Sequence, residues 1–265
     1  MSNGKVYFVG AGPGDPKLLT LRAFELIHKA NVIIYDRLIS KEILDLIPND
    51  VEKIYVGKIP QCKGGISQTE INRLLIEHAR SGKLVVRLKG GDPFIFSRGG
   101  EEVEALTQAK LPFEVIPGIS SALAAPACAG IPLTHRGYSS SVAIVTGHED
   151  PSKICSKVEW AKLASAVDTI VILMGVGKLP QIAEELTKAG LEGSTPVAAI
   201  EYASTGKQRT IVFSLQQTQN VLPRLNSPSV IIIGEVAALA RTLHWNSAAL
   251  IDQISRLIPA EIQIT

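Results

Sequence analysis

The chain has few residues that would point to disulfide chemistry or to a metal. Its three cysteines, Cys62, Cys128 and Cys155, are widely spaced and form no CxxC pair. An odd number of separated thiols favours neither a disulfide framework nor a zinc knuckle, and it is typical of a reducing cytoplasm. The run His148-Glu149-Asp150 has no second ligand cluster to complete it. Adjacent residues in a turn rarely converge on one ion, so we predict no metal.

The chain also lacks a strong net charge and a long apolar run. Its 27 basic and 25 acidic residues leave a formal charge of +2, so no global field points to nucleic acid or to a membrane surface. The first residues run into a short strand and lack the long apolar region of a signal peptide. Residues 118–133, the longest weakly polar stretch, are interrupted by Pro126, which predicts a buried helix and turn rather than a membrane span.

What the chain does contain is typical of an α/β protein. Hydrophobic residues make up 46% and charged residues 20% of a chain long enough to bury a sizeable core. Short β-branched runs alternate with helical patterns in the first half, and they predict strands at 5–10, 31–35, 52–56, 83–88 and 113–116. This alternation predicts a mostly parallel sheet covered by helices on both sides. The clearest helix is expected at 67–81, where Ser67 and Glu70 have the capping-box spacing.

The second half of the chain has a more mixed pattern. Strands are predicted at 141–146, 169–173, 197–201, 210–213 and 230–233. The strands at 197–201 and 210–213 are joined by Ser204-Thr205-Gly206-Lys207, which indicates a hairpin rather than a crossover. We therefore predict an N-terminal α/β domain at 1–117, a C-terminal α/β domain with a mixed sheet at 118–245, and an accessory tail at 246–265. The tail has helical spacing of its apolar residues before Pro259.

A glycine-rich turn, Gly10-Ala11-Gly12-Pro13-Gly14-Asp15, follows the first strand. It suggests a dinucleotide site, but Asp15 stands where that fingerprint needs a third glycine, and Pro13 removes a backbone donor that would hold a pyrophosphate. We interpret Asp15 as a helix cap followed by a proline in the first turn. What remains is an open turn at the carboxyl end of a parallel strand, which is where open α/β sheets bind ligands.

Other unusual turns occupy similar topological positions. Gly90-Gly91-Asp92-Pro93 follows the fourth strand, Pro117-Gly118-Ile119-Ser120-Ser121 follows the fifth, and Met174-Gly175 follows a strand of the second half. A single such turn is usually only a connection between a strand and a helix. Because several fall at strand ends, we expect them to line one crevice.

An ordered series of motifs runs through nearly the whole chain, from about Gly4 to Trp245. In order they are GAGPGDPKLLTLRA, YDRL, VGK, LKGGDPFIFSRGGEE, PGISSA, GIPLTHR, VTGH and MG. Together they resemble the tetrapyrrole methylase family, and an ordered series is far more specific than a lone glycine motif. The resemblance implies a two-domain class III methyltransferase fold that holds S-adenosylmethionine in the cleft between its domains, usually within a homodimer.

The resemblance also implies a reaction. Two methyl groups would pass from S-adenosylmethionine to neighbouring pyrrole rings of uroporphyrinogen III, giving precorrin-2, the branch point toward sirohaem and cobalamin. Two alternatives stay open. The same fold methylates later corrinoids, diphthamide precursors or ribosomal RNA in other members of the family. A nucleotide-binding oxidoreductase or regulatory module that uses the glycine-rich turn is the alternative from another class.

The family's pattern places cofactor contacts, largely through backbone groups, on nine residues. They are Pro13, Gly90, Gly91, Asp92, Ile95, Ser120, Ser121, Met174 and Ala203. Three positions depart from the common pattern of the family. Ala203 and Ser97 stand where glycine is frequent, and Ser121 replaces an alanine. All three are small residues, so the class of enzyme that the resemblance implies does not change.

The resemblance assigns catalytic roles to two residues. Asp36, at the end of the second strand, would be the proton acceptor, and Lys58, in Val56-Gly57-Lys58, would be the proton donor. The residues alone leave open a loop carboxylate paired with Arg37, and a lysine that is only exposed or that binds a substrate carboxylate. Further cations near the predicted strand ends would pair with the acidic side arms of the substrate. They are Arg37, Arg98, His135 and Arg136.

Overall fold

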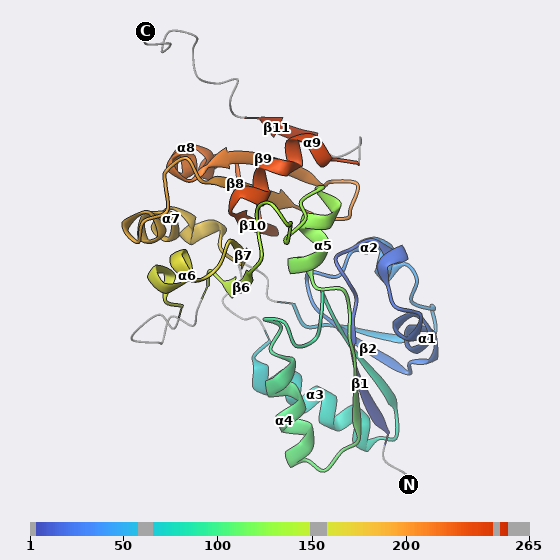
Figure 1. The fold of residues 1–265 in the computed structure, drawn as a ribbon. Coiled ribbons are helices and arrows are strands. Elements are labelled where there is room, and N and C mark those ends of the chain that lie inside the picture. The colour runs from blue at the N-terminus through green and yellow to red at the C-terminus, as the bar shows by residue number, and fades with distance from the viewer. Residues whose placement is uncertain (1–3, 58–65, 149–157, 246–249, 254–265) are drawn as a thin grey trace, which may run out of the picture. The chain divides into compact units, whose positions relative to one another are not determined.

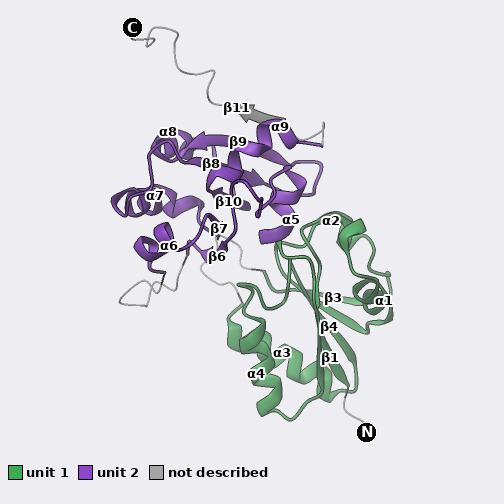
Figure 2. Cartoon of the chain, viewed as in Figure 1, with its two compact units in different colours: residues 1–121 green, residues 122–265 purple. Residues whose placement is uncertain are grey.

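A computed structural model gives the structure of the chain and describes residues 4–57, 66–148, 158–245 and 250–253 (Figure 1). The chain divides into two compact units, residues 1–121 and 122–265 (Figure 2). Each unit has its own sheet and its own core, and each is described by itself. In the described ranges, no helix combines the length and the apolar character that crossing a bilayer requires.

Unit 1 is built on a five-stranded sheet in which every described strand pair is parallel. The strands are β1 (Lys5–Gly10), β2 (Val32–Tyr35), β3 (Glu52–Tyr55), β4 (Leu84–Lys89) and β5 (Phe113–Ile116). Their order is β3-β2-β4-β1-β5, so β4 and β1 lie at the centre. Each strand matches its predicted range to within one residue, and the predicted parallel sheet is confirmed.

Helices cover both faces of this sheet (Figure 1). They are α1 (Leu21–Lys29), α2 (Lys41–Leu44), α3 (Gln68–Arg80) and α4 (Gly99–Gln108). Side chains of α1 and α2 pack with Val86 and Leu88 of β4 on one face, whereas α3 and α4 pack with Val85 on the other. The predicted cap of α3 is present, because the Ser67 side chain accepts a hydrogen bond from the backbone N–H of Glu70.

Unit 2 is built on a six-stranded mixed sheet, as predicted for the second half of the chain. The strands are β6 (Val142–Thr146), β7 (Thr169–Leu173), β8 (Pro196–Glu201), β9 (Arg209–Ser214), β10 (Ser229–Ile233) and β11 (Leu250–Gln253), in the order β11-β9-β8-β10-β7-β6. Strands β8 and β9 pair antiparallel, which confirms the predicted hairpin. Strand β10 is antiparallel to both of its neighbours, β8 and β7.

Unit 2 also has helices on both faces of its sheet. They are α5 (Ser121–Cys128), which begins at the last residue of unit 1, α6 (Trp160–Ala166), α7 (Leu179–Lys188), α8 (Thr218–Val221) and α9 (Ala240–Leu243). Helices α6, α7 and α8 pack on one face of the sheet, and α5 and α9 pack on the other. Helix α5 contains Pro126 and is short and buried, as expected. The helical interpretation of the tail is wrong for residues 250–253, which form β11 and pair in parallel with β9.

Candidate active site

Three turns meet at the carboxyl edge of the sheet in unit 1. Gly12 and Gly91 exchange two backbone hydrogen bonds, of 3.1 and 2.8 Å, which join the turn after β1 to the turn after β4. Oδ2 of Asp92 accepts a hydrogen bond from the N–H of Gly118 at 3.1 Å, which joins the turn after β5. A Cβ atom on Gly10 would lie 2.5 Å from the backbone nitrogen of Gly118, so only glycine permits this approach.

The glycine-rich turn does not stand at the start of an α-helix. Asp15 caps a short 3-10 helix, Pro16–Leu18, by accepting a hydrogen bond from the N–H of Lys17, which confirms its predicted capping role. Helix α1 begins only at Leu21, behind its own cap, Thr20. A dinucleotide site needs a helix N-terminus beside the glycines to hold the pyrophosphate. Geometry and the missing N–H of Pro13 therefore both count against that alternative.

The loop after Asp92 exposes apolar side chains on a strained backbone. Oδ1 of Asp92 accepts a hydrogen bond from the N–H of Phe94 at 2.8 Å, so both carboxylate oxygens are bound by backbone groups. Phe96 and Arg98 have positive φ angles of 52° and 60°. The side chain of Ile95 is 41% exposed. Strained backbone of this kind is common where loops bind ligands, so the cofactor contact at Ile95 stays a prediction.

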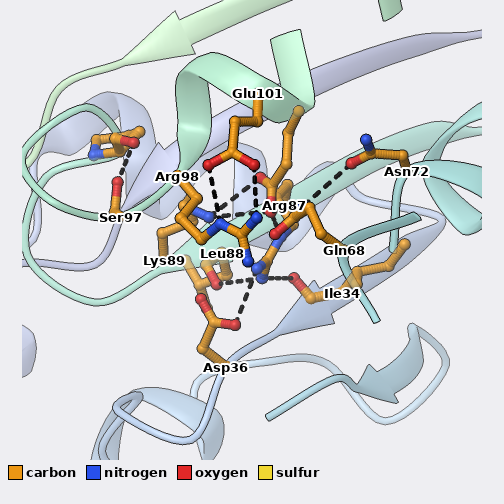
Figure 3. Close-up of polar contacts among 12 residues, drawn as sticks. Ile34, Asp36, Gln68, Asn72, Arg87, Leu88, Lys89, Ser97, Arg98 and Glu101 are labelled. Atoms are coloured by element: carbon orange, nitrogen blue, oxygen red, sulfur yellow. Dashed lines mark hydrogen bonds and ion pairs between the residues drawn. The ribbon is translucent and has the colours of Figure 1, made fainter. Parts of the chain in front are cut away.

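Asp36 follows β2, in a loop that packs beside the glycine-rich turn. The hydroxyl of Ser40 donates a hydrogen bond to the carbonyl of Gly14 at 2.7 Å. The carboxylate of Asp36 pairs with Arg87, whose Nη2 lies 2.8 Å from Oδ1 (Figure 3). The alternative of an ion pair with the neighbouring Arg37 is therefore wrong, and the Arg37 side chain is exposed.

A buried charged cluster lies beneath Asp36, and none of the motifs in the sequence indicates it. Arg87 and Lys89 of β4 and Glu102 of α4 are each 1% exposed. Glu102 accepts hydrogen bonds from Arg87 at 3.2 Å, from Lys89 at 3.1 Å and from Gln68 at 3.2 Å. The pKa of Lys89 is lowered mainly by burial, which disfavours the charged ammonium, and also by repulsion from Arg87. A signal was available, because residues 87 and 89 of a strand point to the same face and cations in a central parallel strand are unusual.

The predicted substrate-binding residues fall in different parts of the chain. Arg37 is exposed in unit 1, whereas Arg98 is held by Glu101 through bonds of 2.9 and 2.5 Å. The hydrogen bond from Arg98 lowers the pKa of Glu101. His135 and Arg136 are exposed in unit 2, where the His135 ring contacts Tyr138 with ring centroids 4.9 Å apart.

Lys58, the second predicted catalytic residue, lies outside the described residues.

The nine predicted cofactor residues are divided between the two units. Pro13, Gly90, Gly91, Asp92, Ile95, Ser120 and Ser121 gather on the turns of unit 1, whereas Met174 and Ala203 follow β7 and β8 in unit 2. Met174 has a positive φ of 56° and a side chain that is 52% exposed. Ala203 is buried. A crevice lined by all of these residues stays a prediction.

The donor set of unit 1 fits S-adenosylmethionine better than a phosphorylated nucleotide. The turns offer backbone groups, the Asp92 carboxylate is already occupied by two N–H groups, and Ile95 and Ile119 expose apolar surface beside them. Such a surface suits an adenosyl group and an aliphatic side chain, whereas a pyrophosphate needs several free N–H donors or cations. Among the residues that the structure describes, no group of three His, Cys, Asp or Glu side chains is placed to hold a metal ion.

Comparison with known proteins gives consistent matches over the chain. The family model of tetrapyrrole (corrin/porphyrin) methylases matches residues 5–219. Uroporphyrinogen-III C-methyltransferase of Bacillus subtilis strain 168 is 47% identical over 252 residues, covering 94% of this chain and 97% of the relative. The S-adenosyl-L-methionine-dependent uroporphyrinogen III methyltransferase of Methanosarcina barkeri is 50% identical over 238 residues, covering 89% and 93%. A Thermus thermophilus uroporphyrin-III C-methyl transferase, solved in complex with S-adenyl homocysteine, is 44% identical with a TM-score of 0.78, covering 89% and 100%.

Proposed function

Because the chain belongs to the tetrapyrrole (corrin/porphyrin) methylases, we propose that it methylates two pyrrole carbons of uroporphyrinogen III with S-adenosylmethionine, giving precorrin-2. The observation that carries the proposal is the meeting of the turns after β1, β4 and β5 at one edge, beside the loop of Asp36. This edge offers backbone contacts for a cofactor and a carboxylate for a proton. The product would enter the synthesis of sirohaem or cobalamin.

Residues of this edge would bind the methyl donor and orient the acceptor. When bound, S-adenosylmethionine supplies a sulfonium methyl, and the S–CH₃ bond breaks as the pyrrole carbon forms its new C–C bond. In-line positioning contributes about 7 to 11 kcal/mol to such a reaction. The methyl donor would be held from unit 1 by Pro13, Gly90, Gly91, Asp92, Ile95, Ser120 and Ser121. From unit 2 it would be held by Met174 and Ala203.

The methylated macrocycle carries a positive charge and must release a proton. Asp36 is the acceptor that we propose, because its carboxylate is partly exposed at the same edge as the turns. A positioned base of this kind contributes roughly 10²- to 10⁴-fold to a rate. Lys58 would be a proton donor when the macrocycle tautomerises, and each proton that it adds would be matched by a further proton lost, so that one proton leaves overall for each methyl group gained. Arg37, Arg98, His135 and Arg136 would pair with the acetate and propionate side arms of the substrate.

A direct assay tests the proposal. The purified protein would be incubated with S-adenosylmethionine and uroporphyrinogen III under reducing, anaerobic conditions, and the product would be analysed by mass spectrometry. We expect a product heavier by two methyl groups. An unchanged mass with intact substrate and donor would overturn the proposal. Methylation of later corrinoids, and not of uroporphyrinogen III, in a competition assay would favour the alternative within the family, and binding of NAD in place of S-adenosylhomocysteine would favour the oxidoreductase.

A homodimer and a cytoplasmic location are part of the proposal. An apolar groove of unit 2, with a volume of about 440 Å³, supports the dimer. It is lined by Leu123 on α5 and by Leu243 on α9, which are 53% and 48% exposed. Exposed apolar patches commonly mark contacts between proteins. Light scattering of the purified chain would give its mass, and cell fractionation would give its location.

A further inference from the structure

The cations beneath Asp36 stand where a protein of this class normally places apolar residues. Strand β4 lies at the centre of a parallel sheet, and such strands are usually continuous runs of Val, Ile and Leu. Arg87 and Lys89 nevertheless occupy two inward positions of β4 and are 1% exposed. Burying charges is costly, and a buried ion pair is often no more stabilising than apolar residues of the same volume. The cluster therefore calls for a role other than stability.

The guanidinium of Arg87 is held in place without any help from Asp36. Nη1 donates hydrogen bonds to the carbonyls of Ile34 and Leu88, each at 3.3 Å, and Nε donates to Glu102 at 3.2 Å. The carbonyl of Ile34 belongs to the neighbouring strand β2 and that of Leu88 to β4 itself (Figure 3). The third acceptor, Glu102, is 1% exposed. The sheet thus sets the position of the group, and the last nitrogen, Nη2, is aimed at the loop after β2.

Among the residues that the structure describes, the contacts of Asp36 involve one of its two oxygens. Oδ1 accepts the hydrogen bond from Nη2 of Arg87 at 2.8 Å, and within the described ranges Oδ2 makes no hydrogen bond. The side chain of Asp36 is 30% exposed, compared with 2% for that of Arg87. The pair therefore runs from the core to the surface. One carboxylate oxygen is anchored from below, and the other is left available at the edge where the turns meet.

The charges of the cluster balance. Arg87 and Lys89 supply two positive charges, and Glu102 and Asp36 supply two negative charges. Lys89 binds both oxygens of Glu102 at 3.1 Å, so these two residues form a neutral pair on their own. Arg87 is then the cation that remains to be matched with Asp36. This division allows the two pairs to be removed separately by mutation.

We infer that Arg87 is a positioning residue for methyl transfer, which fixes Asp36 through Oδ1 so that Oδ2 faces the proton to be removed. The inference rests on the proposed function, because it assumes that Asp36 accepts the proton released by the methylated macrocycle. A carboxylate on a loop can adopt several side-chain rotamers, whereas a carboxylate bound to a guanidinium fixed in the sheet keeps one. Misplacing a reacting group by about 1 Å costs on the order of 10²-fold in rate.

Two double variants with equal charge separate positioning from folding. Arg87→Met with Glu102→Gln removes the anchor of Asp36, and it leaves Lys89 and Asp36 as one charge of each sign. Lys89→Met with Glu102→Gln also removes one charge of each sign from the core, but it keeps the pair between Arg87 and Asp36. Both variants would be compared with the parent for thermal unfolding, S-adenosylhomocysteine affinity, kcat and KM.

We expect the variant without Arg87 to bind S-adenosylhomocysteine within about twofold of the parent, while its kcat falls roughly 10- to 100-fold. The variant without Lys89 should have a kcat about tenfold higher than that of the variant without Arg87, at similar stability. Adding Arg87→Met to an Asp36→Asn chain should lower kcat little further, because the two residues act through one group. A residue that only supported the fold would lower kcat in both double variants alike.

Each other outcome decides against the inference. A parental kcat without Arg87 overturns the inference while the proposed function stands, since the parent still forms the dimethylated product. Equal losses of kcat in the two double variants also overturn it. If the folded parent transfers no methyl group, the proposed function fails and the inference fails with it. Should the first double variant not fold, the single Arg87→Lys variant, which keeps the charge but not the fork, must show the same drop in kcat with an unchanged KM.

Discussion

Asp92 and Gly118 are joined by a hydrogen bond of 3.1 Å, from the backbone N–H of Gly118 to Oδ2 of the carboxylate. The other oxygen of Asp92 accepts from the N–H of Phe94 at 2.8 Å, so one side chain ties together the loops after β4 and β5. In Asp92→Asn, one of these N–H groups must face an amide NH₂. A hydrogen bond to a charged group contributes about 1.5 to 3 kcal/mol, and we expect S-adenosylhomocysteine to bind about tenfold more weakly by calorimetry.

The exposed Asp50 offers a matched control for this change. It lies between α2 and β3 in unit 1, away from the three turns, and Asp50→Asn makes the same chemical replacement. We expect the control to keep the parental affinity. If Asp92→Asn also binds like the parent, the two loops are held together by other contacts and the role of Asp92 is wrong.

A second prediction concerns the close approach of the turns at Gly118. A Cβ atom at this position would overlap the carbonyl oxygen of Gly91 and the backbone of Gly10. We expect Gly118→Ala to lower the free energy of unfolding by about 1 to 3 kcal/mol, because backbone atoms must move to admit the methyl group. Urea denaturation would measure the change, and S-adenosylhomocysteine binding should weaken in parallel.

Gly100 provides the opposite case in the same unit. It lies in the first turn of α4, and a Cβ atom there would meet nothing within 4 Å. Gly100→Ala should therefore raise the free energy of unfolding by about 0.4 to 1 kcal/mol, since alanine restricts the unfolded chain. Equal effects of the two substitutions would contradict the view that the turns are packed against each other.

The strands could be predicted well because their signal is local. Runs such as Val32–Tyr35 and Thr169–Leu173 are β-branched and bounded by turn residues, and the structure has them at or within a residue of the predicted bounds. The helical prediction for the tail is wrong because it rests on local spacing alone. Leu250 and Ile251 fit a helical pattern and a short strand equally well, and pairing with β9, a contact with a distant part of the chain, decides between them.

The candidate site was only partly accessible from the sequence. The turns carry glycines and prolines in ordered motifs, so Gly91 and Asp92 could be named in advance, although their roles stay proposals. The link between Asp36 and Arg87 could not be named. It depends on the register of β2 against β4, in which Ile34 lies opposite Arg87 and the next turn carries Asp36 over the guanidinium. Registers are set by tertiary packing, which no local motif reports.

Met174 gives a third prediction, because its backbone is strained and its side chain is exposed. Its φ is 56°, a conformation that costs about 1 kcal/mol or more for a residue such as methionine. Asparagine tolerates this region better, and little packing is lost because the side chain is 52% exposed. Met174→Asn should therefore leave the thermal midpoint unchanged or slightly higher, while S-adenosylhomocysteine binding weakens. A large loss of stability with parental binding would show that Met174 only supports the fold.

The last prediction concerns pH and Asp168, between α6 and β7 of unit 2. Its Oδ2 atom accepts hydrogen bonds from the N–H of Ser140 at 2.7 Å, from the N–H of Ser141 at 3.1 Å and from the Ser141 hydroxyl at 3.0 Å. These hydrogen bonds lower the pKa of Asp168 below its ordinary value, and the bond from the backbone of Ser140 has the largest effect. The carboxylate thereby joins the entry of β6 to the entry of β7.

A carboxyl group with a lowered pKa in the folded state stabilises the protein above its unfolded pKa of about 3.9. That contribution is lost as the pH falls through the folded pKa. We therefore expect the urea midpoint of Asp168→Asn to lie below that of the parent at neutral pH, and the two midpoints to converge in the acid range. Ser141→Ala, which removes one donor to the same carboxylate, should show a smaller difference with the same trend. A difference between parent and Asp168→Asn that stays constant with pH would mean that the ionised form of Asp168 does not hold these strand ends together.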